Sequence, residues 1–431
     1  MTSAKLLVVL VFANILLGIH CESVVDDTIS WVPLLGATQT RTLGGHILVN
    51  ELSGGYLYYF LTESQSNPAT DPLIIWLQGG PGSSSMFGCF VENGPYLIQP
   101  NGSFVDNPYA WNARANVMWI DNPVGTGYSY VKDSSGYATD EWQIARQLVH
   151  FLSSFFKTHP EYSTLDLYLF GESYAGKYVP WFAATMLQTS TNPPFNLKGI
   201  GLGNGWVSPY WQAGSYAPFL QQNNRINASV AAKANEIYQE YVSYLEQQDY
   251  YTALELDGEL FDYLCVNSNP PVTNYYDIRK VDDPTTPPEQ VMNQWLNSTP
   301  TALSMNANNA IFDSGDIAYY SLDEDEEKSA LFLLPILLHK GIKVMLYNGQ
   351  YDLICNWLGT YSYAVEIDWQ YKHEFNTAPE QSWYLNGQKV GHYIKAENLL
   401  FVVVYDAGHM SPFDQPESTL DMLHKFVDNQ F

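Results

Sequence analysis

The sequence predicts an α/β protein with a mostly parallel central sheet, helices on both faces of that sheet, and an inserted, mainly helical cap. Three observations predict it: short continuous apolar runs, helical patterns between those runs, and a polar stretch in the middle of the chain. Continuous runs of Val, Ile, Leu and Tyr are typical of strands covered on both faces. Alternating strands and helices favour a layered sheet, and 431 residues exceed what one core requires, so an insertion is expected.

Seven segments are expected to form strands: Tyr56–Leu61, Pro72–Leu77, Asn116–Ile120, Leu165–Phe170, Lys198–Leu202, Lys343–Tyr347 and Leu399–Val404. Between them, Asp140–Thr158 has apolar residues at helical spacing, with Thr139 or Asp140 as its cap and Pro160 as its stop. A second helix is expected over Ala175–Gln188.

The middle of the chain has a different composition, rich in Gln, Asn, Tyr and Glu and without buried-strand runs. We therefore expect residues 210–316 to form an inserted cap subdomain, and residues 23–209 and 317–431 to form the body. The acidic run Asp323–Glu327 is expected to be a solvated face or loop.

The N-terminus has the pattern of a secretory signal peptide over residues 1–22. Lys5 precedes the apolar run Leu6–Ile19, which is too short to span a bilayer. No later stretch is long and apolar enough for a membrane span. On a secretory route, the sequons at Asn101, Asn227 and Asn297 are candidate glycosylation sites. A secreted, lysosomal, vacuolar or yolk location is expected, and the choice among them stays open.

Composition limits the partners. The formal charge is −26, from 19 basic and 45 acidic residues, which argues against nucleic-acid binding because the field repels polyanions. Cys89, Cys265 and Cys355 are too far apart in the sequence for a metal motif, and no His-rich cluster lies near them. No metal and no cofactor are expected. The assembly state stays open, with a homodimer as one expectation.

The strongest local motif is Gly171-Glu172-Ser173-Tyr174-Ala175-Gly176, which follows a predicted strand and precedes a predicted helix. This is the context of a nucleophile elbow, in which a sharp turn exposes a serine hydroxyl above the sheet. The second glycine of the usual motif is replaced by Ala175. The motif predicts that Ser173 is a nucleophile.

A glycine-rich loop supports this interpretation. Gly79 and Gly80 follow the strand Pro72–Leu77, and glycine runs expose backbone N–H groups that can stabilise an oxyanion. In the α/β-hydrolase fold, one donor comes from such an upstream loop and another from the residue after the nucleophile. Gly79, Gly80 and Tyr174 are therefore the candidate oxyanion hole.

The remaining catalytic groups are expected after later strands, in the order Ser, Asp, His. Asp352 follows the strand Lys343–Tyr347, and His409 follows Leu399–Val404. Both lie just beyond carboxyl ends of strands, where open α/β sheets place their sites. The predicted triad is Ser173, Asp352 and His409.

With these motifs in place, the sequence resembles the serine carboxypeptidases, and within them the vitellogenic-like branch. The matching blocks are Trp76–Ser85, Glu92–Pro95, Asp121–Gly127, Gly171–Gly176, Gly349–Asp352 and Gly408–Met410, and the branch is indicated by Trp76–Gly82, Met86–Gly88 and Tyr347–Gln350. The resemblance implies an exopeptidase that releases single residues from peptide and protein C-termini through an acyl-enzyme.

The resemblance also implies roles for further residues. Four of them are expected to bind the terminal carboxylate of the substrate: Trp76, Gln78, Glu92 and Glu172. Met410 is expected to touch the departing side chain. Since two carboxyl groups close together cannot both ionise, Glu92 and Glu172 are expected to titrate with a raised pKa and to favour acidic pH.

Three positions depart from the family pattern. Gln78 stands where the family usually has Asn, and Ser83 where it often has Cys. With that cysteine missing, a disulfide from Cys89 to Cys265 is expected instead. Cys355 lies three residues after Asp352, so a free thiol is expected beside the site, as in some relatives.

Two other functions stay open. A carboxypeptidase-like esterase or acyltransferase uses the same triad on the same scaffold. A non-enzymatic yolk or lysosomal protein that binds partners is the second alternative, and the complete triad weighs against it. The preferred C-terminal side chain is not indicated.

Overall fold

The fold is taken from a computed structural model, which describes residues 27–189, 195–281, 287–307 and 311–431. The predicted signal peptide, residues 1–22, lies outside the described residues, as does Cys21. In the part of the chain that is described, no helix is both long and apolar enough to cross a bilayer.

The described strands form one large sheet and one small hairpin. The large sheet has the order β1-β2-β3-β7-β4-β8-β9-β10-β13-β12-β11. Its strands are β1 (Thr28–Val32), β2 (Gly36–Asn50), β3 (Gly55–Thr62), β4 (Leu73–Leu77), β7 (Asn116–Ile120), β8 (Leu167–Glu172), β9 (Leu197–Gly203), β10 (Lys343–Gly349), β11 (Gln381–Leu385), β12 (Gln388–Ala396) and β13 (Leu399–Val404). The hairpin pairs β5 (Tyr96–Ile98) with β6 (Phe104–Asp106).

The centre of the sheet is parallel and its margins are antiparallel. Strands β7, β4, β8, β9, β10 and β13 pair in parallel, while the outer pairs on each side are antiparallel. All seven predicted strands are present, with boundaries shifted by a few residues at most. The marginal strands β1, β2, β11 and β12 were not predicted, because their partly exposed residues give no continuous apolar run.

Two apolar layers cover the sheet, one on each face. In β4, Leu73, Ile75 and Leu77 belong to one buried cluster, and Ile74 and Trp76 belong to the other. This alternation follows from the two-residue period of a strand. Because both clusters are buried, the strand reads as one continuous apolar run, as the sequence pattern predicts.

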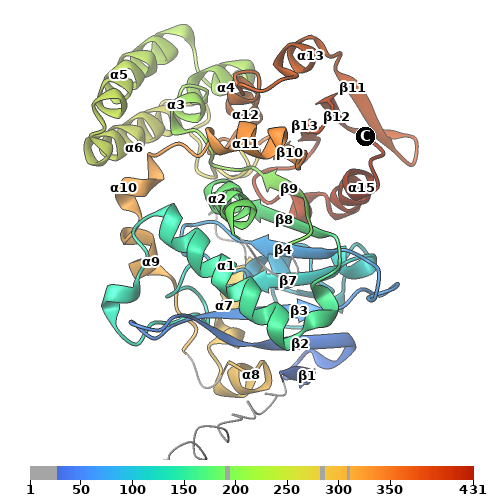
Figure 1. The fold of residues 1–431 in the computed structure, drawn as a ribbon. Helices are drawn as coiled ribbons and strands as arrows, with labels where there is room; N and C mark the ends of the chain where they lie inside the picture. The colour runs from blue at the N-terminus through green and yellow to red at the C-terminus, as the bar shows by residue number, and fades with distance from the viewer. Residues whose placement is uncertain (1–26, 190–194, 282–286, 308–310) are drawn as a thin grey trace, which may run out of the picture.

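The helices surround the sheet (Figure 1). They are α1 (Glu141–Thr158), α2 (Ala175–Gln188), α3 (Pro209–Ala213), α4 (Tyr216–Gln222), α5 (Ala228–Gln247), α6 (Tyr250–Val266), α7 (Pro287–Leu296), α8 (Thr299–Ser304), α9 (Asp316–Tyr320), α10 (Asp323–Glu326), α11 (Leu333–His339), α12 (Trp357–Ala364), α13 (Lys372–Thr377), α14 (Ser411–Asp414) and α15 (Pro416–Val427). The side chain of Asp140 accepts a bond from Gln143 N at 2.8 Å, which caps α1 as predicted. Helix α2 begins at Ala175 although Pro180 lies inside it.

The segment predicted as a cap is helical, and its helices lie in two places. Helices α3 to α6 lie together at one side of the molecule, whereas α8 lies beside β1 at the other end (Figure 1). The buried residues agree, since Leu260 of α6 belongs to one apolar cluster and Met292 of α7 to the other. The α7–α8 part therefore packs under the other face of the sheet.

The prediction of a solvated acidic run at Asp323–Glu327 is wrong in part. Asp325 and Glu327 are only 4% and 3% exposed. Lys177 of α2, itself buried, lies 3.5 Å from Asp325 Oδ2, and the Tyr241 hydroxyl donates to Glu327 Oε2 at 2.6 Å. A buried ammonium requires a nearby carboxylate, so this part of the run is drawn into the core.

The predicted Cys89–Cys265 disulfide is also wrong. Cys89, Cys265 and Cys355 are free and buried. Cys89 lies in the short π-helical turn η1 (Gly88–Glu92) and Cys265 near the end of α6, and the two thiols belong to different apolar clusters. A bridge needs Cα atoms within about 7 Å, which residues packed in separate layers do not meet.

Candidate active site

Ser173 occupies a strained turn between β8 and α2. Its φ is +60°, a value that residues with a Cβ rarely adopt, and strain of this kind is typical of a nucleophile elbow. A Cβ on Gly171 would lie 2.6 Å from the Ala175 methyl, and one on Gly176 would lie 2.6 Å from Trp206 N. Positions 171 and 176 therefore require glycine, whereas Ala175 fits in the core in place of the usual second glycine.

The glycine-rich loop lies directly against this turn. A Cβ on Gly79 would lie 2.6 Å from Tyr174 N and 2.7 Å from Ser173 Cβ, so the two backbones approach closely only because residue 79 has no side chain. Gly80 follows with a φ of +106°, a conformation that favours glycine. The contact brings the predicted oxyanion-hole residues Gly79, Gly80 and Tyr174 to one place beside Ser173.

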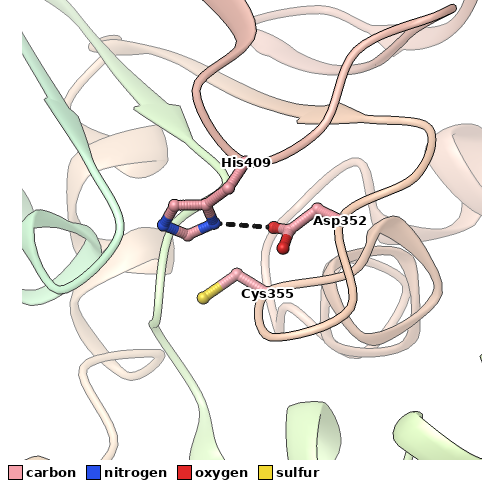
Figure 2. A group of neighbouring side chains, drawn as sticks. All are labelled: Asp352, Cys355 and His409. Atoms are coloured by element: carbon pink, nitrogen blue, oxygen red, sulfur yellow. Dashed lines mark hydrogen bonds and ion pairs between the residues drawn. The ribbon is translucent and has the colours of Figure 1, made fainter. Parts of the chain in front are cut away.

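Asp352 and His409 form a buried hydrogen-bonded pair. The Nδ1 atom of His409 lies 2.9 Å from Asp352 Oδ2, and the two side chains are 3% and 0% exposed. Their loops leave neighbouring parallel strands, because Gly349 at the end of β10 pairs with Val404 at the end of β13. The bond fixes one ring nitrogen, so the other ring nitrogen is available on the opposite side of the imidazole (Figure 2).

Two neighbours of this pair were missed from the sequence. Asn204, just after β9, donates from Nδ2 to Asp352 Oδ2 at 2.8 Å and accepts from Ser411 Oγ at 3.0 Å. The ring of Tyr276 stacks on the imidazole of His409, and the backbone oxygen of Tyr276 accepts from His409 N at 2.7 Å. A polar residue at the end of a buried strand could have indicated Asn204, but no sequence signal linked Tyr276 to the site.

Cys355 lies beside the pair, as its position in the sequence predicts. A carboxylate oxygen of Asp352, the sulfur of Cys355 and a ring nitrogen of His409 lie within 4.8 Å of one another (Figure 2). Burial, followed by the charge of Asp352, raises the pKa of the Cys355 thiol well above its usual value. Because Asp352 and His409 bond to each other, the group is an acid–base pair with a neutral thiol next to it.

A second buried network lies at the ends of β4 and β8. Gln78 Nε2 donates to Glu172 Oε1 at 2.8 Å and to Glu92 Oε1 at 3.2 Å, and the Trp76 indole donates to Gln78 Oε1 at 2.8 Å. All four side chains are 5% exposed or less. The longer amide at position 78 therefore bridges both carboxyl groups while the indole fixes its orientation.

The two carboxyl groups hold a proton more readily than free glutamates. Burial raises the pKa of Glu92 to about 7, and burial together with the charge of Glu92 raises the pKa of Glu172. Glu92 Oε2 and Glu172 Oε2 accept no hydrogen bond from another described residue. An ionised carboxylate can only accept hydrogen bonds, so neither group can donate to the other unless it is protonated. A proton on either carboxyl group would turn that group into a donor.

These groups meet at one cavity of about 400 Å³. Its walls include Gln78, Gly79, Gly80, Glu172, Ser173, His409 and Met410, together with Ser83, Ser84, Phe87, Tyr276, Glu289, Met292, Asn293, Asn297, Phe312, Asp313 and Ser314. Trp76 is fully buried and is not among the described residues that line the cavity. It contacts the site through the hydrogen bond from its indole to Gln78. The cavity therefore places the Ser173 side chain, an imidazole and a carboxyl-lined recess side by side.

The three sequon asparagines are all exposed. Asn101 lies in the turn between β5 and β6, and its Oδ1 accepts from Ser103 N at 3.0 Å. Asn227 caps α5, and its Oδ1 accepts from Ser229 N and Val230 N. Asn297 lies at the cavity.

The sheet order, the turn at Ser173 and the Asp–His pair are those of an α/β-hydrolase fold. The family model described as serine carboxypeptidase matches residues 33–429. The chain therefore belongs to the serine carboxypeptidase family and is a serine-type carboxypeptidase, a hydrolase.

Similar proteins agree with this assignment. The chain is 36% identical over 400 residues to serine carboxypeptidase S10 family member 1 of Dictyostelium discoideum, covering 91% of this chain and 95% of that protein. It is 33% identical to the human protein named probable serine carboxypeptidase CPVL, covering 90% and 83%. The fold matches Kex1Δp, a prohormone-processing carboxypeptidase from Saccharomyces cerevisiae, with a TM-score of 0.81 at 24% identity, covering 90% and 92%. The CPVL relatives are consistent with the branch indicated by the sequence.

Proposed function

We propose that the enzyme hydrolyses the last peptide bond of its substrates through an acyl-enzyme formed on Ser173. The observation that carries the proposal is the single cavity that holds Ser173, His409 and the Gln78–Glu172 bond. A nucleophile beside a recess for a carboxyl group suits a substrate whose reacting carbonyl lies one residue from its C-terminus.

In this mechanism, Ser173 Oγ attacks the carbonyl carbon while His409 Nε2 takes the hydroxyl proton. Asp352 stays ionised and orients the imidazole through the bond at 2.9 Å. Backbone N–H groups of Gly79, Gly80 and Tyr174 stabilise the negative oxygen. His409 then protonates the departing amine, and water releases the remaining acyl group by the reverse sequence.

The released amino acid carries the terminal carboxylate. Gln78 and Glu172 line the cavity and bind this carboxylate, with Glu92 behind them and Trp76 holding Gln78 in place. A protonated Glu172 donates to the carboxylate, whereas two ionised glutamates repel it. Activity on peptides is therefore expected to be highest in acid. Met410, which also lines the cavity, contacts the departing side chain.

The same triad would serve an esterase or acyltransferase, but the buried carboxyl network favours substrates with a free C-terminus. The test is hydrolysis of matched peptides that differ only in a free or amidated C-terminus. A strong preference for the free acid supports the carboxypeptidase, and equal rates favour the esterase.

We propose that the chain passes through the secretory pathway with residues 1–22 as its signal.

A further inference from the structure

One wall of the cavity is formed by α7 and the residue that follows it. Glu289, Asn293 and Asn297 recur at intervals of four residues, and all three line the cavity. The deeper residues Glu172 and His409 are buried, whereas Asn293 and Asn297 are exposed. Asn297 therefore lies at the rim, where the cavity opens to solvent.

Asn297 is also the first residue of Asn297-Ser298-Thr299, an acceptor sequence for N-glycosylation. The other two acceptor asparagines, Asn101 and Asn227, are exposed but are not among the described residues that line the cavity. Position 297 is thus distinguished from them by location alone, and they can serve as its controls.

The geometry of the Asn297 amide suits the modification. Its Nδ2 donates to Asn293 O at 3.0 Å, which uses one of its two hydrogens. In glycosylation, Nδ2 forms a bond to C1 of N-acetylglucosamine, the bond from C1 to a lipid-linked diphosphate breaks, and one proton leaves the nitrogen. The hydrogen that remains can keep the bond to Asn293, so the end of α7 need not move.

We propose that Asn297 carries an N-linked glycan at the mouth of the catalytic cavity, and that this glycan selects substrates by size. A glycan is bulky and hydrated. A short or flexible peptide can pass it as an extended chain, whereas a folded protein with a short C-terminal tail must bring its own surface against the rim. The inference rests on the proposed function and on its secretory route.

The first measurement is the mass of the Asn297 peptide from enzyme secreted by a eukaryotic cell. We expect that peptide to carry a glycan, and an unmodified Asn297 would overturn the proposal. This measurement needs no activity, so it does not depend on the proposed hydrolysis. Absence of dipeptide hydrolysis by wild type would contradict the proposed function and leave the result of the mass measurement unchanged.

The second measurement compares Thr299→Ala, which removes the acceptor sequence but keeps Asn297, with Thr299→Ser, which preserves it. For a folded protein with a short tail, kcat/KM should rise about tenfold in Thr299→Ala, within the range over which access changes association rates. Hydrolysis of a blocked dipeptide should change less than about twofold. Thr299→Ser, Asn101→Gln and Asn227→Gln should behave as wild type. An unchanged ratio of the two substrates in Thr299→Ala contradicts the selection by size.

Discussion

Tyr276 stacks on the imidazole of His409 with ring centroids 4.7 Å apart and ring planes 16° apart. The tyrosine comes from the segment between β9 and β10, so that segment supports the His409 ring as well as covering the sheet. A stacked pair of rings contributes about 0.5–1.5 kcal/mol, and here the contact also limits rotation of the imidazole plane.

The stack predicts the behaviour of two variants at position 276. Tyr276→Ala should lower kcat by about tenfold, because the imidazole loses the surface that holds its plane. Tyr276→Phe keeps the stacked ring and should retain most of the activity. Steady-state kinetics on one peptide checks both, and equal losses in the two variants would show that the hydroxyl, and not the stack, matters.

Asn204 is expected to be a positioning residue for the Asp352 carboxylate. A hydrogen bond to a charged group contributes about 1.5–3 kcal/mol, so Asn204→Ala should lower kcat by roughly 10- to 100-fold. KM should change little, because Asn204 is not among the described residues that line the cavity. Ser411→Ala, which removes the bonds from the hydroxyl to Asn204 and to Gly408 O, should have a smaller effect, because neither bond is to Asp352. A rise in KM at constant kcat in Asn204→Ala would contradict this role.

The Glu92–Glu172 pair predicts how peptide binding depends on pH. Its folded-state pKa values are raised, for Glu92 to about 7, against about 4.3 in the unfolded chain. The pair therefore stabilises the fold most in acid, and this contribution is lost as pH rises toward 7. KM for peptides should rise over the same interval, since the protonated carboxyl group that donates to the substrate is lost.

Replacing both residues by Gln removes this titration. The double variant Glu92→Gln/Glu172→Gln should show a nearly flat KM between pH 5 and 8 for peptides, where wild type is predicted to rise about tenfold or more. Ester substrates without a free carboxylate should be affected little in either protein. The same pH dependence of peptide KM in both proteins would exclude the pair as the carboxylate site.

Glu141 predicts a separate effect on stability. It is buried, and burial raises its pKa to about 8, although the charge of Lys177 opposes the rise. The native state then holds a proton that the unfolded chain lacks between about pH 4.3 and 8, so stability falls as pH rises through this interval. Glu141→Gln should match wild type at pH 4 and exceed it at pH 8, on the order of 1 kcal/mol or more.

Denaturant unfolding at the two pH values measures the effect of Glu141→Gln. The exposed residue Glu246 provides the control, and Glu246→Gln should leave the pH dependence unchanged. If Glu141→Gln loses stability between pH 4 and pH 8 as steeply as wild type, the carboxyl of Glu141 is not the group that titrates.

The sequence predicted the parts of the molecule that have strong local signals. Continuous apolar runs indicated β3, β4, β7, β8, β9, β10 and β13, because strands buried on both faces have no polar positions. The elbow could be identified because its glycines are required locally: at Gly171 and Gly176 a Cβ would collide with the next elements. Asp352 and His409 were proposed from their position after strands, and the structure joins them by a hydrogen bond, while their catalytic role stays a prediction.

Features that depend on long-range packing could not be predicted. Asp325 and Glu327 look like a solvated acidic run, and only the fold brings Lys177 and Tyr241 to them. The prediction of a Cys89–Cys265 disulfide was wrong for the same reason, since spacing in the sequence does not reveal that the two thiols lie in different layers. Tyr276 is separated from His409 by 133 positions, and nothing local marks it.

The central claim is that Ser173 is the nucleophile of an enzyme that removes one residue at a time from a free C-terminus. The most direct measurement is the release of amino acids from one peptide, with a free or an amidated C-terminus, by wild type and by Ser173→Ala. Wild type should release the terminal residue of the free peptide first, and Ser173→Ala should lose about 10⁶-fold in rate, as in well-studied serine triads. Undiminished release by Ser173→Ala, or wild-type cleavage that ignores the C-terminus, would contradict the account.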